Sequence, residues 1–153
     1  VITIPFKINE DASRDEEKQD EVTASIKGLN ILLVEDNELN MEIAEFVIQS
    51  KGASVVKAWN GQEAVEAFEK SASGEFDVIL MDVMMPVMNG YEATKTIRTM
   101  DRSDAKKIPI IAMTANSFVE DRIKSKEAGM NEHIVKPVDV ELLIKVIHKL
   151  VEY

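Results

Sequence analysis

Residues 76–82 read FDVILMD, an apolar run that ends in an acid. After Asp77 the run is apolar at every position up to Asp82, so a strand built from it would be buried on both faces. Strands of this kind are typical of a parallel sheet that is covered by helices on each side. The stretch therefore predicts an α/β fold, with Asp82 at the end of a buried strand.

Other apolar stretches of the same kind alternate with helical patterns along the chain. The predicted strands are, in chain order, residues 31–34, 54–58, 76–81, 108–113 and 133–135. Apolar residues at helical spacing, such as Leu39, Ile43 and Phe46, predict helices between and after the strands. Because crossovers between parallel strands are right-handed, we expect an open, doubly wound, flavodoxin-like five-stranded parallel sheet of order 2-1-3-4-5, with five helices.

Composition excludes several classes of protein. The 153 residues are 45% hydrophobic, which is enough for one packed domain. The formal net charge of −10 argues against a nucleic-acid binder, because phosphate contacts need clustered Lys and Arg. Without cysteine there is no disulfide scaffold and no thiolate site. The apolar runs are too short to cross a bilayer. We expect a cytoplasmic fragment that contacts neither nucleic acid nor membrane.

The first 28 residues differ in character from the rest. Residues 1–8 alternate as a strand does, and predict a remnant strand separated from its sheet. Residues 9–28 are acidic and contain few apolar side chains, so we expect a linker, with a solvated helical extension as the alternative. The domain itself is expected at residues 29–153. Because the chain begins with Val1 rather than Met, we expect a piece of a longer protein.

Polar side chains follow the predicted strands, all at one edge of the sheet. Glu35 and Asp36 follow the first strand, Asp82 the third, Thr114 the fourth and Lys136 the fifth. Three carboxylates and one ammonium sum to −2, and like charges this close resist ionisation. A divalent cation would neutralise the site. Oxygen ligands without His or Cys favour Mg²⁺, or Mn²⁺ in its place, over zinc.

The residue types suggest a division of roles around such an ion. Asp36 and Asp82 are the predicted direct ligands, and Glu35 is expected to act through water. The backbone carbonyl of Met84 is a further candidate oxygen. Magnesium typically takes one or two carboxylates and keeps several waters, which suits this set.

A carboxylate beside a metal ion can attack a phosphoryl group and form an aspartyl phosphate. Asp82 is the best candidate nucleophile, because it ends the central strand and a flexible turn follows it. Lys136 would pair with one phosphoryl oxygen as a point charge, and the Thr114 hydroxyl would donate to another. The predicted chemistry is therefore phosphoryl transfer to Asp82.

Four motifs in this order resemble those of the receiver domain of two-component response regulators. They are ILLVEDN (31–37), ILMDVMMPVMNG (79–90), IAMTA (111–115) and IVKP (134–137), and the similarity covers about residues 29–151. The resemblance implies that Asp82 accepts phosphate from the phosphohistidine of a histidine kinase or phosphotransfer domain. It also implies a cis peptide between Lys136 and Pro137.

In this family, the threonine and the lysine couple phosphorylation to a change of shape. The resemblance implies that Thr114 moves inward and that His133, at the switch-aromatic position, repacks. The face formed by residues 117–128, 133–135 and the last helix would then change its affinity for a partner. Met84 and Asn116 flank the pocket and are expected to tune the lifetime of the phosphate. One departure is Glu35, where Asp is frequent.

The ends of the chain suggest a wider context. Residues 1–8 look like the closing strand of a histidine-kinase ATPase domain, and no DNA-binding domain follows the last helix. Together these features suggest the carboxyl-terminal receiver of a hybrid sensor histidine kinase, whose parent chain would be the kinase and could be membrane-anchored. A stand-alone single-domain response regulator is the alternative.

Three other functions fit less well. A haloacid-dehalogenase-type phosphatase needs its nucleophile after the first strand and a second Asp two residues on, where this chain has Met84. A flavodoxin-like flavin binder needs a phosphate loop after the first strand, where Glu35 and Asp36 would repel phosphate. A receiver-like binding module without phosphorylation would not need the complete set of acids, hydroxyl and lysine.

Overall fold

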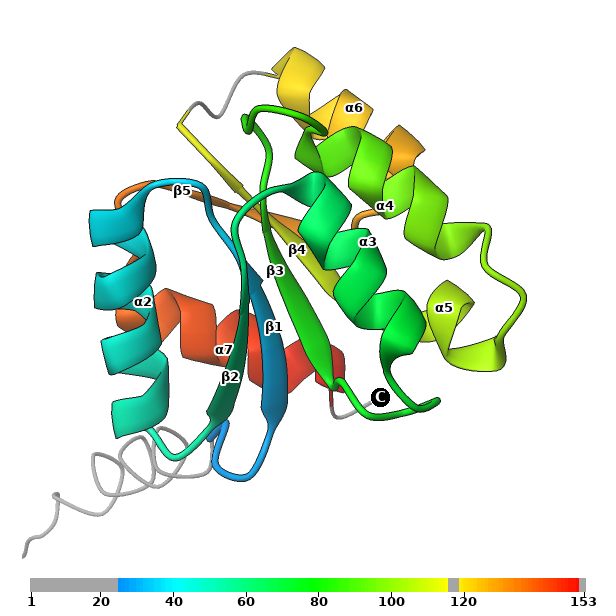
Figure 1. The fold of residues 1–153 in the computed structure, drawn as a ribbon. Coiled ribbons are helices and arrows are strands. Elements are labelled where there is room, and N and C mark those ends of the chain that lie inside the picture. Colours follow the sequence, from blue (N-terminus) through cyan, green and yellow to red (C-terminus); the bar gives the residue numbers. More distant parts are fainter. Residues whose placement is uncertain (1–24, 116–118, 152–153) are drawn as a thin grey trace, which may run out of the picture.

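A computed structural model of the chain describes residues 25–115 and 119–151. Five strands and, in these residues, six helices alternate along the chain (Figure 1). The strands are β1 (Asn30–Val34), β2 (Ser54–Ala58), β3 (Val78–Asp82), β4 (Ile110–Thr114) and β5 (Glu132–Val135). The helices are α2 (Glu38–Ser50), α3 (Gly61–Lys70), α4 (Gly90–Arg98), α5 (Ser103–Lys107), α6 (Val119–Ala128) and α7 (Val140–Val151).

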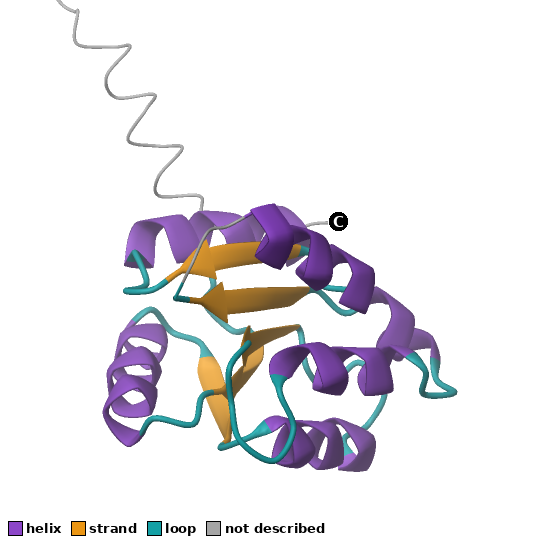
Figure 2. Cartoon of the chain, turned by 90° about the horizontal axis from the view of Figure 1, so that it is seen from above, coloured by secondary structure: helices purple, strands orange, loops and turns teal. Residues whose placement is uncertain are grey.

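The strands form one parallel sheet in the order β2-β1-β3-β4-β5, which confirms the predicted topology. Helices cover both faces of the sheet (Figure 2). Two hydrophobic clusters fill the layers: one joins the sheet to α2 and α7, and the other joins it to α3, α4 and α5. Helix α6 packs beside α4. The central strands β1, β3 and β4 are therefore buried on both faces, whereas the edge strands β2 and β5 are partly exposed.

Strand β3 is the central strand and is buried along its whole length. Its side chains alternate between the two layers, with Val78 and Leu80 in one cluster and Ile79 and Met81 in the other. Asp82 is the last residue of the strand and is itself only 4% exposed. The apolar run thus carries an acid into a largely buried position at the carboxyl edge of the sheet.

The prediction of five helices was wrong, because a short helix, α5, lies between α4 and β4. Its five residues contain one buried apolar side chain, Ala105, so α5 has no apolar periodicity from which a helix could be predicted. Polar contacts hold this segment in place. The Arg102 guanidinium pairs with Asp104 at 2.7 Å, donates to the Phe68 and Ser71 carbonyls at the end of α3, and lies 4.3 Å from the centre of the Phe68 ring.

Two strands begin two residues later than predicted. Before β4, Pro109 has no N–H to donate to a neighbouring strand, although its carbonyl accepts from Ile79. Before β3, the Asp77 amide donates to the Asn30 carbonyl at 2.8 Å, and the Asp77 carboxylate takes the place of a backbone carbonyl by accepting the Asn30 amide at 2.8 Å, so the pairing of β1 and β3 ends here. Both strands continue one residue further than expected, and Asp82 and Thr114 are therefore strand residues.

Helix α2 forms where predicted, but the predicted apolar stripe does not face the core. Met41 and Ile48 are buried, whereas Leu39, Ile43 and Phe46 are 64%, 54% and 74% exposed. The exposed stripe, defined here as Leu39, Ile43 and Phe46, runs along the outer side of the helix. Isolated exposed apolar residues are ordinary, but three in helical register form a surface that a partner can cover.

The packed unit includes residues before 29. Ile26 is 1% exposed and belongs to the cluster beneath α2 and α7. The Gly28 amide donates to the Gly52 carbonyl at 2.9 Å, where the left-handed φ of +85° at Gly28 suits glycine. The predicted strand at 1–8 and most of the predicted linker at 9–28 lie outside the described residues. Within those residues, every helix is too short or too polar to span a bilayer.

Candidate functional site

Three charged side chains from three strand ends meet at the carboxyl edge of the sheet. The Lys136 Nζ lies 2.9 Å from Glu35 Oε1 and 3.2 Å from Asp82 Oδ2. Glu35 is 3% exposed, and its amide donates to the Ala58 carbonyl at 3.1 Å, which fixes the chain as it leaves β1. The Lys136 amide donates to the Thr114 carbonyl at 2.7 Å and so extends the pairing of β4 and β5. The ion-pair network is thus anchored by backbone bonds at each end.

The acids are placed so that they can share one cation. One carboxylate oxygen each from Glu35, Asp36 and Asp82 lie within 4.8 Å of one another. Both oxygens of Glu35 are already engaged, because Oε1 faces Lys136 and Oε2 accepts the Asn37 amide at 3.1 Å. Asp36 is exposed. Oxygen donors at this spacing fit a hard divalent cation, with Asp36 and Asp82 the better placed to bind it directly.

The electrostatics of the site favour a proton or a cation on Asp82. Burial raises the pKa of Asp82 from 3.8 to about 7, and the Glu35 charge adds to the rise while Lys136 opposes it. For Lys136, burial works to lower the pKa, but hydrogen bonding and charge pairing with Glu35 and Asp82 outweigh it and raise the pKa. The network therefore has one carboxylate more than its lysine can neutralise.

The predicted switch residues lie on the next strands of the sheet. Thr114 ends β4, is 7% exposed and stands opposite Val135 of β5. His133 is half-buried on β5, opposite Ala112. The peptide between Lys136 and Pro137 is cis. Asn116 lies outside the described residues, so its predicted role stays a prediction.

The loop from β3 to α4, residues 83–89, is tightly closed. The Gly90 amide donates to the Val83 carbonyl at 2.9 Å, and the Met88 amide donates to the Pro86 carbonyl at 2.7 Å. The second bond makes a three-residue turn centred on Val87, whose φ is +71°. Such a backbone is strained for a β-branched residue. Sequence reasoning missed this strain, because valine carries no signal for a left-handed position.

Met84 lies in the same loop and is 75% exposed. The sequence predicts that the Met84 carbonyl binds the metal. Met84 lies in the loop that follows Asp82, and the role of its carbonyl stays a prediction. The Met84 thioether does not indicate a site for a soft metal, because the acids near it are hard oxygen donors.

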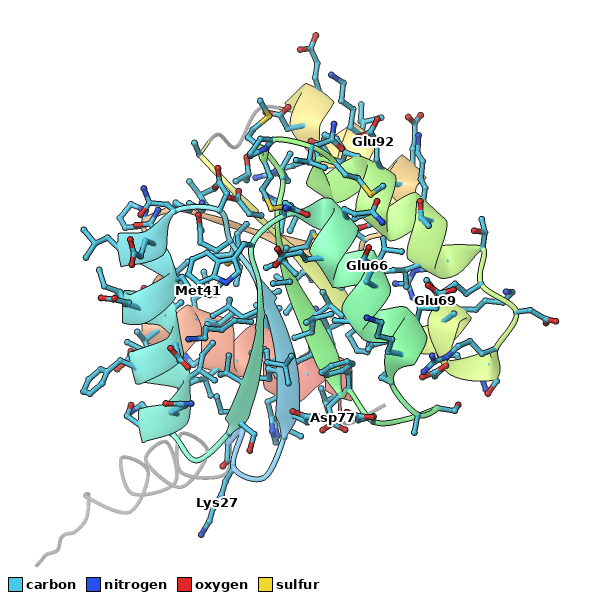
Figure 3. The ribbon with its side chains drawn as sticks, in the orientation of Figure 1. Lys27, Met41, Glu66, Glu69, Asp77 and Glu92 are labelled. Carbon is cyan, nitrogen blue, oxygen red and sulfur yellow. The ribbon has the colours of Figure 1, made fainter. Side chains whose placement is uncertain are left out.

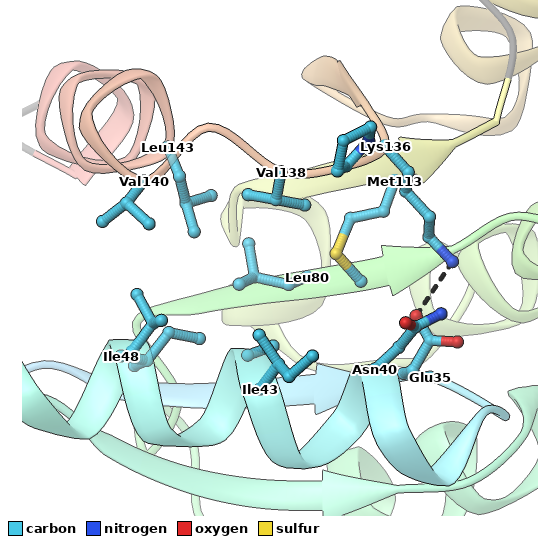
Figure 4. A pocket seen from close by; sticks show the side chains of 13 residues that line it. Glu35, Asn40, Ile43, Ile48, Leu80, Met113, Lys136, Val138, Val140 and Leu143 are labelled. Carbon is cyan, nitrogen blue, oxygen red and sulfur yellow. Dashed lines mark hydrogen bonds and ion pairs between the residues drawn. The ribbon is translucent and has the colours of Figure 1, made fainter.

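Sequence reasoning also missed a cavity of about 410 Å³ beside the acids. Figure 4 shows Glu35 and Lys136 at one end of this cavity, next to Asn40, and apolar side chains from α2 and α7 along the rest. The apolar lining includes Ile43 of the exposed stripe and Leu143 of α7. No motif marks the cavity, because its lining comes from segments about 100 residues apart in the sequence.

Comparison with known proteins agrees with this geometry. Residues 31–148 match the family described as the response regulator receiver domain. The chain belongs to this family. Over 82% of its length, this receiver domain is 33% identical to Histidine kinase 1 of Arabidopsis thaliana, and over 79% it is 43% identical to Hybrid signal transduction histidine kinase M of Dictyostelium discoideum. It spans only 13% and 5% of those two proteins.

A solved structure supports the assignment. The receiver domain is similar to that of the sensor histidine kinase PA1611 from Pseudomonas aeruginosa, with a TM-score of 0.75 and 36% identity over 82% of this chain and 99% of that one. That structure is described as having a magnesium ion coordinated in its active-site cleft. The relatives named above are histidine kinases, one of them hybrid, and the expected membership in a two-component receiver family is confirmed.

Proposed function

We propose that this receiver domain accepts a phosphoryl group on Asp82 from a phosphohistidine, with Mg²⁺ or Mn²⁺ as the cofactor. One observation carries the proposal: Lys136 lies within 3.2 Å of Asp82 in a cluster where three carboxylate oxygens converge within 4.8 Å. In receiver domains of histidine kinase phosphorelays, the phosphate comes from a histidine-containing partner.

The proposed ligands follow from what each side chain is already bonded to. Asp36 and Asp82 would bind the cation directly, while Glu35 would act through water because both of its oxygens have protein partners. The Met84 carbonyl would supply a further oxygen. When bound, the cation would neutralise the excess acid and offset charge on the phosphoryl oxygens.

The transfer step needs little from the protein beyond position and charge. A carboxylate oxygen of Asp82 forms a bond to phosphorus as the phosphorus–nitrogen bond of the donor breaks, and the electron pair of that bond returns to the imidazole. Lys136 then moves its pairing from the carboxylates to a phosphoryl oxygen, and the Thr114 hydroxyl donates to another. Glu35, which accepts the Asn37 amide at 3.1 Å, would keep this contact during the transfer.

The consequence of phosphorylation would appear on the face of α6, β5 and α7. Helix α6 buries only Ser125 and Ala128, and it packs against α4 and β5. A helix held by so few apolar contacts can shift at small cost. Movement of Thr114 and repacking of His133 would therefore bias α6 between two positions.

The donor would approach across α2. The exposed stripe of Leu39, Ile43 and Phe46 lies on the same helix whose amino end faces the acids, and Ile43 also lines the cavity that ends at Glu35 and Lys136. Apolar side chains of a histidine-bearing helical partner would cover this surface and bring the phosphohistidine to Asp82. A partner of this kind suits the site because the apolar surface and the acids are continuous.

The wider architecture is also part of the proposal. Because the chain spans a small part of its histidine kinase relatives, we propose that it is the receiver of a hybrid sensor histidine kinase, with residues 1–8 from the ATPase domain and residues 9–28 as the linker. A cytoplasmic location of the receiver would follow. Isolation of the native full-length protein and determination of its mass and domain order would test this architecture.

The phosphoacceptor is tested by incubating the chain with Mg²⁺ and acetyl phosphate. We expect a mass increase of one phosphoryl group, loss of that increase in Asp82→Asn, and its retention in the control Asp101→Asn, which changes an exposed aspartate away from the site. Labelling that persists in Asp82→Asn, or no labelling of the wild-type chain, would show that the domain is a binding module or uses another acceptor.

The docking surface is tested by comparing two donors. Phe46→Ser should slow transfer from a phosphorylated histidine phosphotransfer domain and leave transfer from acetyl phosphate unchanged, because the small donor needs no docking surface. Equal rates with the protein donor for Phe46→Ser and wild type would exclude a role of the exposed stripe.

A further inference from the structure

Hydrogen bonds hold the first turn of α3 in place beside the phosphorylation site. The Asn60 side chain accepts the Glu63 amide at 2.9 Å, and the Glu63 carboxylate accepts the Trp59 amide at 2.9 Å. The first bond satisfies one of the free amides at the helix start, and the second ties the Glu63 side chain to the residue before the cap, so together they hold the position of this turn. Ala58, which precedes them, accepts the Glu35 amide. The start of α3 is therefore tied to the same strand end that carries Glu35.

Gly61, the first residue of α3, touches the loop between β3 and α4. Its amide donates to the Met88 carbonyl at 3.0 Å. A Cβ at this position would lie 2.4 Å from the Met88 oxygen, and 2.9 Å from both the Met88 carbonyl carbon and its Cγ. The φ of Gly61 lies outside the left-handed region, so an L residue could adopt this backbone. Glycine is required at position 61 because a side chain would not fit there, and not because of the backbone conformation.

The loop itself, residues 83–89, is held at its ends and within itself. Gly90 closes it by donating to Val83, and Met88 donates to Pro86 within the turn. The bond from Gly61 is a contact to a different segment, so it sets where the closed loop sits relative to the sheet edge. Met84, whose carbonyl is the proposed metal ligand, is carried by this loop.

We propose that Gly61 is a positioning residue for the metal site: by leaving room for the Met88 carbonyl, it lets the loop that carries Met84 lie against the start of α3 and face the acids. This inference rests on the proposed function, in which Met84 is a ligand. Gly61 itself touches neither metal nor phosphate.

The size of the effect follows from the geometry. Ordinary contact begins at 3.4 Å, so a Cβ at 2.4 Å requires the Met88 carbonyl to move by about 1 Å. Magnesium tolerates little departure from octahedral geometry, and displacements of about 1 Å at a catalytic site cost on the order of 100-fold. Alanine is otherwise the better residue in a helix, so the substitution should not weaken α3 by itself.

The test is Mg²⁺ titration of Gly61→Ala, followed by the fluorescence of Trp59, the one tryptophan of the chain. We expect the Kd for Mg²⁺ to rise about 10-fold or more. In the metal-free protein, the amide of residue 61 should also lose protection from hydrogen exchange, because the Met88 carbonyl no longer accepts from it.

The matched control is Gly74→Ala. Gly74 has a left-handed φ of +82° and no atom within 4 Å of an added Cβ, so this substitution strains the backbone without touching the loop. Its Mg²⁺ affinity should equal that of the wild type even though its stability falls. A folded Gly61→Ala with the wild-type Kd would overturn the inference.

Two further variants separate the possible failures. Asp36→Asn should weaken Mg²⁺ binding if the proposed function is right, so loss of affinity there with none in Gly61→Ala rejects only the role of Gly61. No loss in Asp36→Asn rejects the metal site itself. If Gly61→Ala does not fold, Asn60→Ala loosens the same turn without adding a side chain at 61, and an unchanged Kd in that variant would overturn the inference.

Discussion

In the absence of metal, the phosphoacceptor should destabilise the domain that carries it. Burial beside Glu35 raises the pKa of Asp82 from 3.8 to about 7. The folded state therefore retains a proton that the unfolded state releases, and stability is lost as the pH rises from about 4 to about 7. Replacing Asp82 with asparagine removes this loss, because the amide is neutral at every pH and has nearly the same shape.

The magnitude follows from the shift. At about 1.4 kcal/mol for each pH unit, a rise from 3.8 to about 7 corresponds to about 4 kcal/mol above pH 7. About half of this is already lost at pH 5.5, which leaves about 2 kcal/mol between pH 5.5 and pH 8. Solvent at the open side of the site screens the charges, so we expect about 1 kcal/mol in the measurement.

The assay is urea unfolding followed by Trp59 fluorescence, in EDTA, at pH 5.5 and pH 8. The stability gained by Asp82→Asn over the wild type should be about 1 kcal/mol larger at pH 8 than at pH 5.5. Comparing the two pH values cancels any effect of the amide on packing. Asp101→Asn should show no such pH-dependent gain. A gain from Asp82→Asn that is the same at both pH values would refute the reasoning.

Three further substitutions test the packing around the site. Val87→Gly should raise the free energy of unfolding by about 1 kcal/mol, because strain in the left-handed turn outweighs the added freedom of the unfolded chain; a lower urea midpoint would contradict this. The hydrogen bond from Arg102, strengthened by charge, lowers the pKa of Asp104 to about 2. Asp104→Asn should therefore cost about 1 kcal/mol at pH 7, a cost that shrinks as the pH falls from about 4 toward 2, measured by urea unfolding across that range. A cost independent of pH would show that the ion pair is not its source. Ile26→Ala should cost about 3 kcal/mol in the same assay, and an unchanged midpoint would show that the packed core begins later.

The sequence was sufficient for the sheet because its strands are read directly from apolar runs. Residues 76–82 alone place a buried strand and its terminal acid, and the carboxyl ends of parallel strands must share an edge. The approach of Glu35, Asp82 and Lys136 therefore needed no coordinates. The prediction of this site rested on the order of the strands and on the position of each polar residue just after an apolar run.

The features that the sequence did not predict depend on side chains from distant segments. Helix α5 is held by Arg102, whose carbonyl partners at Phe68 and Ser71 lie about 30 residues away, and its own sequence has no apolar period. The outward face of α2 could not be foreseen, since Leu39 and Phe46 have the same helical spacing as a buried stripe. The contact between Gly61 and Met88 likewise joins the start of α3 to the loop between β3 and α4, and a glycine at the start of a helix reads as an ordinary turn residue.

The burial of Ile26 fixes the point where the polypeptide enters the domain. That point lies just before β1, at the edge of the sheet opposite Asp82, and Figure 3 places Lys27 there, far from the strand ends that carry the acids. The chain thus enters the domain on the opposite side of the molecule from the phosphorylation site. A dye or a solid support attached to the exposed Lys27 would leave the phosphorylation site open, which makes surface-based measurements of donor binding feasible with this chain.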